Sequence, residues 1–221
     1  MVKTEIQDGS VDGMASKSGR FSAHDCLLAA IQTTCRGQGS IRLEVPDAGH
    51  VLIDADQGHF WPQIDCDQTF FNTNSANALI EPEPAGSDPV GSRPIEELLW
   101  QAAWTGSNGA LLERCQLYDV VSLKHWPNFT RLPHSEHLFP LCSLLAHRPT
   151  SMSFAYRMLK VPEPEAFRFF SAATAAGCLS VVSSQPPRSG SEPGDEGATT
   201  ARAEHGVAGF WGRLFKRISG L

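Results

Sequence analysis

A stretch rich in proline, glycine and serine at residues 81–94 constrains the fold of this chain more than any other feature. Its sequence, EPEPAGSDPVGSRP, holds too many residues that break helices and strands to form either. Short alternating segments precede it, and helical periodicities follow it. We therefore expect two small domains, at residues 21–80 and 95–182, joined by a linker at residues 81–94.

The first predicted domain is a short helix followed by a β-meander. Ser22 and Asp25 can form a capping box for an amphipathic helix that ends near Gly37. Ile41, Leu43 and Val45 alternate with polar neighbours before the turn sequence PDAG, and the segment HVLID follows the turn, which predicts a β-hairpin. A third strand is expected to begin in the sequence HFW and to break at Pro62.

The second predicted domain is mostly helical. A helix with Trp100 and Trp104 one turn apart should end near Gly106, and the short strand YDVVSL follows it. Three further helical segments and a final strand complete the domain: SEHLFPLCSLLAHR, SMSFAYRMLK, PEAFRFFSAATAAG and LSVV. This order resembles a winged-helix module that lacks its second wing strand. The expected fold class is α+β, with a helix-plus-β-meander domain before a winged-helix-like helical domain.

Charge is distributed unevenly along the chain. The net charge is −6, and residues 20–84 alone carry nine acidic and three basic side chains. A protein that coats nucleic acid needs a concentrated positive field, so this composition argues against that class. No apolar run approaches the roughly 18 residues of a membrane-spanning helix, and the polar start of the chain does not look like a signal peptide. These features predict a cytoplasmic protein.

The end of the chain carries the most specific binding signal. Residues 1–20 and 183–205 have the composition of a disordered tail and a disordered linker, and residues 206–221 form a predicted basic amphipathic helix. Its apolar and cationic side chains lie on opposite sides: Phe210, Trp211, Leu214, Phe215 and Ile218 against Arg213, Lys216 and Arg217. Such a helix can lie at the inner membrane surface, dock in a partner groove or fold back on its own domain.

An aromatic loop is the second candidate for binding. The segment HWPNFTRLP combines Trp126, Phe129 and Arg131 with two prolines. Tryptophan and arginine are frequent at the energetic centres of interfaces, but they also pin long loops onto cores. The sequence leaves both interpretations open.

The would-be recognition helix of the winged-helix module is poorly suited to DNA. Its polar residues are Glu165, Arg168, Ser171 and Thr174, and Glu163 adds a second acidic side chain at its start. Reading of base edges normally uses Arg, Lys, Asn or Gln. DNA binding by a winged-helix transcription regulator is therefore the alternative, behind a role in protein contacts.

No catalytic, cofactor-binding or metal-ligating residues are predicted. The six cysteines fall mostly in apolar runs with no close spacing, which favours reduced core residues. The histidines at 134 and 137 lack a third ligand, and the aspartates at 54, 56, 65 and 67 do not fit a calcium loop. The sequence contains no G-x-S-x-G motif, P-loop or dinucleotide-binding fingerprint.

The first domain also resembles a known family. Its helix CLLAAIQ and the following GQGSIRLEV-PDAG-HVLIDADQGHFW are similar to the PATAN-type adaptor domains of bacterial signalling proteins. The similarity covers about a quarter of the chain and carries over no functional residues. It implies a non-enzymatic adaptor in a bacterial regulatory pathway that binds protein partners.

Overall fold

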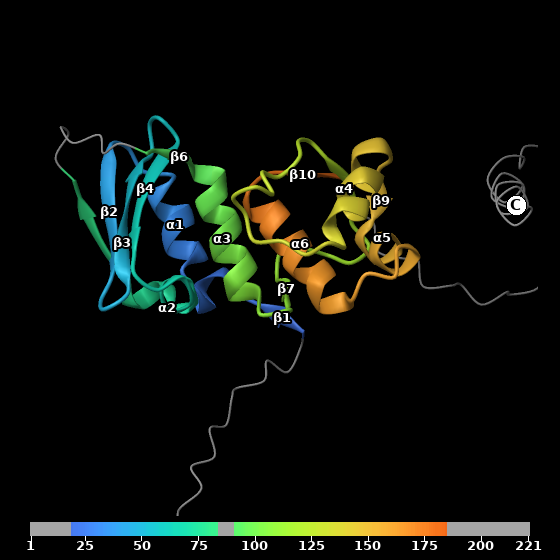
Figure 1. Cartoon of the computed structure of the whole chain (residues 1–221), viewed down its shortest axis with the longest axis horizontal. Helices are drawn as coiled ribbons and strands as arrows, with labels where there is room; N and C mark the ends of the chain where they lie inside the picture. Colours follow the sequence, from blue (N-terminus) through green and yellow to red (C-terminus); the bar gives the residue numbers. More distant parts are fainter. Residues whose placement is uncertain (1–18, 84–90, 185–221) are drawn as a thin grey trace, which may run out of the picture. The chain divides into compact units, whose positions relative to one another are not determined.

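A computed structural model describes residues 19–83 and 91–184. Helices and strands both occur in this part of the chain, which confirms the predicted α+β class (Figure 1). The predicted tail, linker and C-terminal helix at residues 1–18, 185–205 and 206–221 lie outside the described residues. No helix in the described part is long and apolar enough to cross a membrane.

The first half of the described chain contains the larger sheet and its helices. In chain order its elements are β1 (Arg20–Phe21), the 3-10 turn η1 (Ala23–Asp25), α1 (Leu28–Thr34), β2 (Ser40–Val45), β3 (Gly49–Asp54), β4 (His59–Ile64), α2 (Asp67–Asn72), the 3-10 turn η2 (Ser75–Asn77), β5 (Leu79–Pro82) and β6 (Arg93–Pro94). Strands β2 to β6 form one antiparallel sheet in the order β5-β2-β3-β4-β6. The predicted hairpin is its centre, β2 and β3.

The turn of this hairpin explains its residues. Asp47 and Gly49 both have positive φ angles, 61° and 111°, which a tight turn between twisted strands requires. Gly49 is also fixed by space, because a Cβ there would collide with the backbone of Gln63 in β4. The sequence PDAG therefore sets the register of β2, β3 and β4.

The prediction that Pro62 ends the third strand is wrong. β4 continues to Ile64, and Pro62 pairs in register with Val51. The N–H of Asp65 donates to Ala48 on the β3 side, whereas the carbonyl of Gly58 accepts from Ile95 on the opposite side. The backbone N–H and C=O groups of the even-numbered residues in β4 are therefore directed away from β3. On that side β6 pairs with β4 no further than Phe60. At Pro62 no strand of the described chain pairs with β4 on that side, so the missing N–H of proline leaves no hydrogen bond of the sheet unmade.

Ser22 forms the predicted capping box with Asp25, but it caps the turn η1 rather than one continuous helix. Cys26 is extended, with φ −135° and ψ −178°, and interrupts the helix before α1 begins. Its side chain lies against Gly106, where an added Cβ would collide with the sulfur. The interruption between η1 and α1 therefore lies where Cys26 packs closely against Gly106.

The second half of the described chain combines four helices with four short strands. Its elements are α3 (Ile95–Ser107), β7 (Leu111–Leu112), β8 (Val120–Leu123), α4 (Leu138–His147), β9 (Thr150–Ser151), α5 (Met152–Met158), α6 (Glu163–Ala175) and β10 (Leu179–Ser183). Three of the strands form a sheet in the order β10-β8-β9, so β8 lies between the two strands that flank α5 and α6 in sequence. β7 pairs in parallel with β1.

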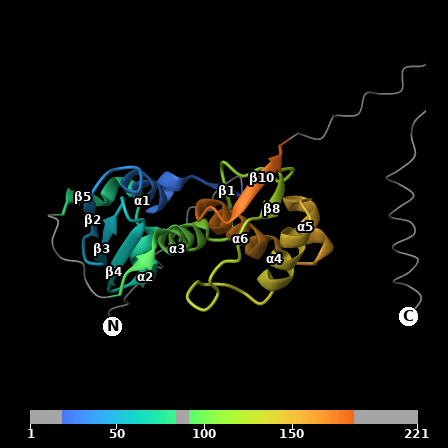
Figure 2. The same cartoon turned by 90° about the horizontal axis from the view of Figure 1, so that it is seen from above.

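The two predicted domains share one buried core. The inward residues Leu43, Val51 and Ile53 of the sheet belong to the same apolar cluster as Leu98 of α3 and Phe169 of α6. α3 lies between the sheet side and α6 in both views (Figures 1 and 2) and contacts helices on either side. β5 and β6 extend the sheet into both ends of the predicted linker, and residues 84–90 lie outside the described part.

All six cysteines are free thiols, as predicted. Burial raises the pKa of Cys26 to about 11 and that of Cys142 to about 12, so both stay protonated and apolar at neutral pH. Cys66 is exposed, and a hydrogen bond from Thr69 lowers its pKa. Cys66 differs in this respect from the buried cysteines of the core.

Candidate interaction surface

The aromatic loop between β8 and α4 packs against α3, which holds it in place. Trp100 of α3 is fully buried, stacks on Trp104 and meets the edge of Phe129 at a centroid distance of 6.2 Å. Its indole N–H donates to the carbonyl of Pro133 at 3.1 Å. Both halves of the loop are therefore held by a single tryptophan.

Glu97, one turn before Trp100, provides the polar part of this attachment. Its buried carboxylate accepts from Arg93 Nε at 2.8 Å and from Asn128 Nδ2 at 3.2 Å, and Arg131 Nη1 lies 4.0 Å away. The side-chain oxygen of Asn128 also accepts from the Thr130 hydroxyl, and the backbone carbonyl of Asn128 accepts from the backbone N–H of Leu132. A buried carboxylate is tolerated only with such partners, so Glu97 and the loop require each other.

The outer side of the loop is apolar and accessible. Trp126 is 50% exposed, and Phe139, at the start of α4, is 46% exposed. The rings of Phe129, His134 and Phe139 lie within 5.0–5.8 Å of one another. His134 Nδ1 lies 2.9 Å from the carbonyl of Leu132, which assigns the proton of the neutral ring to Nδ1. We name Trp126, Arg131, His134 and Phe139 the loop surface.

The three predicted contact residues thus have different positions. Phe129 is half-buried under the loop surface and acts as its anchor, whereas Trp126 and Arg131 are exposed. Phe129 therefore attaches the loop to the core, whereas Trp126 and Arg131 are accessible to solvent. The predicted contact residues of the terminal helix, from Phe210 to Ile218, lie outside the described residues.

A second polar contact fixes the end of the loop. Glu165 of α6 accepts from the hydroxyl of Ser135 at 2.5 Å and lies 2.9 Å from His137 Nδ1. The hydrogen bond from Ser135, followed by that from His137, lowers the pKa of Glu165. Although serine, histidine and glutamate meet here, both bonds end on the carboxylate. His137 does not contact the serine as a general base would.

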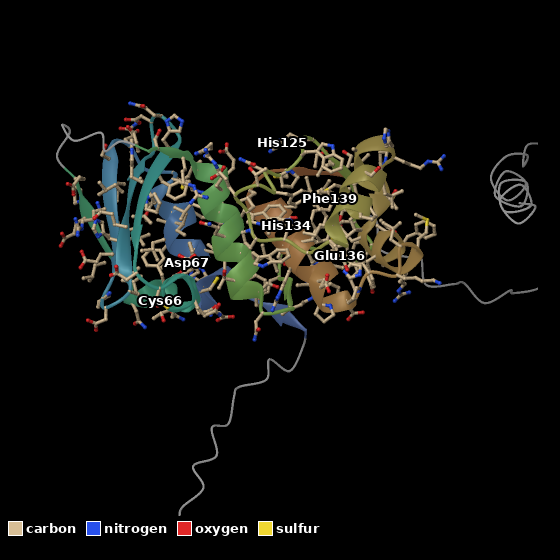
Figure 3. The ribbon with its side chains drawn as sticks, viewed as in Figure 1. Cys66, Asp67, His125, His134, Glu136 and Phe139 are labelled. Carbon is tan, nitrogen blue, oxygen red and sulfur yellow. The ribbon has the colours of Figure 1, made fainter. Side chains whose placement is uncertain are left out.

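The weaker metal candidates separate in space. His134 bonds the backbone and His137 bonds Glu165, so the two rings are directed to different partners. His134 lies beside Phe139, whereas Cys66 and Asp67 lie apart from them at the start of α2 (Figure 3). Asp54 accepts the N–H groups of Asp56 and Gln57 in a turn. Within residues 19–83 and 91–184, no group of three or more His, Cys, Asp or Glu could hold a metal ion.

The helix that would read DNA is largely inside the fold. α6 buries eight residues against its neighbours: Ala166, Phe167, Phe169, Phe170, Ser171, Ala172, Ala173 and Ala175. Ser171, one of its few polar side chains, is fully buried and accepts the backbone N–H of Leu112 at 2.9 Å. The exposed start of α6 carries Glu163. α6 therefore offers a DNA groove very few donors.

Sequence reasoning did not identify the contact between Glu97 and Asn128. The two residues are 31 positions apart, and neither belongs to a recognisable motif. The only local signal was the i, i+4 spacing of Arg93 and Glu97, which is common on exposed helices. Phe139 belongs to the apolar sequence of α4, so the sequence did not distinguish it from core residues.

The chain was compared with models of known protein families, with curated proteins and with solved structures, and none of the three comparisons finds a match.

Proposed function

We propose that this chain is a non-enzymatic adaptor that binds a protein partner through the loop surface. The observation that carries the proposal is the exposure of Trp126 and Phe139 on a segment that Glu97 and Trp100 hold in place. Large aromatic side chains are costly to leave in water, and a surface that is already ordered loses little entropy on binding. Arg131 at its edge adds a donor suited to carboxylates.

The pathway class follows from the resemblance of residues 21–80 to bacterial signalling adaptor domains. The proposed location is the cytoplasm. Residues 206–221 then provide a second contact, with a partner groove or with the inner membrane surface, through the predicted basic amphipathic helix. In this proposal the loop surface selects the partner.

The alternative, a DNA-binding transcription regulator, has less support. It requires α6 in the major groove, but most of α6 packs against α3 and its neighbours. Salt-sensitive, sequence-specific binding of the full chain to duplex DNA would favour this alternative over the adaptor.

The test compares partner capture by matched variants of the full chain. Trp126→Ala and Phe139→Ala remove exposed rings, while Leu79→Ala removes an equally exposed side chain from β5 as a control. A genuine partner is recovered by the native chain and by the control, and it is lost with both loop variants. After purification of that partner, each loop variant should weaken the dissociation constant at least about tenfold, as expected for an interface anchor.

A third variant tests whether the loop must be held in place. Glu97→Gln removes the charge that Arg93 and Asn128 bind, and we expect it to destabilise the fold by about 2–3 kcal/mol and to weaken partner binding. Glu96→Gln, an exposed neighbour on α3, is the control and should change neither quantity. Urea denaturation measures the free energy of unfolding. Normal partner binding by the Trp126 and Phe139 variants would refute the proposed surface.

A further inference from the structure

One segment of the described chain lacks acidic side chains. Residues 137–162 contain no Asp or Glu, but they contain three cationic residues, Arg148, Arg157 and Lys160. This segment forms α4, β9 and α5. In a chain with a net charge of −6, it is a local region of positive charge.

α5 exposes apolar side chains within this region. Phe154 is 49% exposed and Met158 is 45% exposed. Together with the exposed Arg157 they occupy about 100° of the helix circumference, because residues three and four apart lie on one side. Lys160 follows directly, also exposed, at the left-handed residue that ends the helix. We name Phe154, Arg157, Met158 and Lys160 the α5 face.

The opposite side of α5 packs into the core. Ala155 and Tyr156 are buried there, and the Tyr156 hydroxyl donates to Glu163 at 3.2 Å. Glu163 is the next acidic residue along the chain, and this bond holds it on the side away from Phe154 and Met158. The Arg157 guanidinium lies 5.8 Å from the centroid of the Tyr156 ring but remains exposed. The α5 face thus has an apolar centre and a cationic edge.

We infer that the α5 face is a contact site for an anionic membrane surface. Exposed Phe and Met side chains can enter the boundary between lipid headgroups and acyl chains, and Lys and Arg at the edge meet the anionic headgroups. Nucleic acid fits less well, because Phe and Met cannot hydrogen-bond to base edges and three cations neutralise few phosphates. The inference goes beyond the proposed adaptor function, since it requires no protein partner.

The α5 face alone should bind weakly and reversibly. Each cation near an anionic surface strengthens binding by about fivefold. Residues 206–221 belong to the same chain and carry Arg213, Lys216 and Arg217 beside apolar side chains. Two weak contacts on one chain reinforce each other, because the second binding step is intramolecular. The expected role of the α5 face is to orient the folded unit against the membrane.

The test measures co-sedimentation of the purified full chain with vesicles of phosphatidylcholine alone and with vesicles containing 30% phosphatidylserine. The native chain should bind only the anionic vesicles, and 0.5 M salt should weaken the binding. The double variant Phe154→Gln with Met158→Gln should reduce affinity about tenfold or more, since two half-exposed apolar side chains are lost. The double variant Arg157→Glu with Lys160→Glu should do the same.

Two controls separate the α5 face from general effects. Leu79→Gln with Ile80→Gln changes an equally exposed apolar pair on β5, and Arg36→Glu reverses an exposed cation after α1. Neither should change vesicle affinity by more than about twofold. All variants are compared by circular dichroism and thermal melting, because their exposed positions should leave the fold intact.

Three results would overturn the inference. The first is failure of the native chain to bind anionic vesicles. The second is unchanged affinity of both α5 double variants, which would assign all binding to the rest of the chain. The third is binding to duplex DNA that the charge-reversal variant loses and the Phe154 and Met158 variant keeps. If no protein partner binds the loop surface, the expected vesicle binding of the α5 face is unchanged.

Discussion

Glu165 shows how a single carboxylate can link the stability of this fold to pH. It joins the start of α6 to the loop through Ser135 and His137. The pKa of Glu165 is lowered below its ordinary value of 4.5, first by the Ser135 hydrogen bond. A carboxylate whose pKa is lower in the folded state stabilises that state above its unfolded pKa. This contribution is lost as the pH falls through the folded pKa.

Replacement of Glu165 therefore has a pH-dependent effect. Glu165→Gln should lower the free energy of unfolding at pH 7, and the difference from the native chain should shrink as the pH falls below 4.5. Urea denaturation at pH 7, 5, 4 and 3 measures the difference. The exposed Glu136→Gln is the control and should show no comparable trend. A difference that stays constant across this range would mean that the carboxylate is not ionised in its folded role.

At the scale of elements, the sequence predicted those with strong periodicity. The β2–β3 hairpin, α3 and α6 each have enough alternating or helical positions to be recognised. α2, β5 and β6 were missed for physical reasons. α2 and β5 are six and four residues long, β5 is exposed along its whole length, and β6 is a two-residue strand that contains a proline. Such elements are stabilised by neighbours distant in sequence.

The start of α5 illustrates the limit of local signals. Thr150 and Ser151 both precede this helix, but the Ser151 hydroxyl accepts the N–H of Phe154, while the Thr150 hydroxyl donates to the carbonyl of Arg148. Two adjacent hydroxyl residues give the same sequence signal. Only the backbone conformation at each decides which one caps the helix.

Removal of this cap should be measurable. Ser151→Ala should destabilise the protein by about 1 kcal/mol, and Ser151→Asp should restore most of the loss because a carboxylate also accepts at this position. Thermal melting of the two variants beside the native chain makes the comparison. Equal melting temperatures for all three would show that the hydroxyl of Ser151 does not support α5.

The candidate site was predicted only in part. Trp126, Phe129 and Arg131 stood out because two aromatic residues and an arginine beside two prolines are unusual in a loop. Their separation into an anchor and a surface depends on Glu97 and Trp100, which contact the loop from a helix about 30 residues away. A single sequence does not reveal such pairings.

At the scale of the whole molecule, the shared core joins the two predicted domains. Phe169 of α6 is fully buried against Trp100 of α3, and both belong to the apolar cluster that contains the sheet residues. The sequence indicated a boundary at residues 81–94 because composition reports local chain propensity. It does not report which helices later pack together.

This arrangement predicts cooperative unfolding. Phe169→Ala should cost about 3–5 kcal/mol through the cavity that it leaves. Amide hydrogen exchange should then show the loss of protection in the distant strand β3 as well as in α6, because both depend on the same core. Unchanged protection in β3 would instead show that the sheet is an independently stable domain.

The pairing of β1 with β7 has a consequence for the covalent continuity of the chain. Arg20 and Phe21 lie beside Leu111 and Leu112, and the backbone bonds Leu111 N–H to Gly19 O and Glu113 N–H to Phe21 O hold them there. The two halves of the described chain are thus joined by core packing and by the pairing of β1 with β7, as well as by the peptide backbone. Two polypeptides, one ending after Glu83 and one beginning at Gly91, should therefore associate non-covalently and form the same fold.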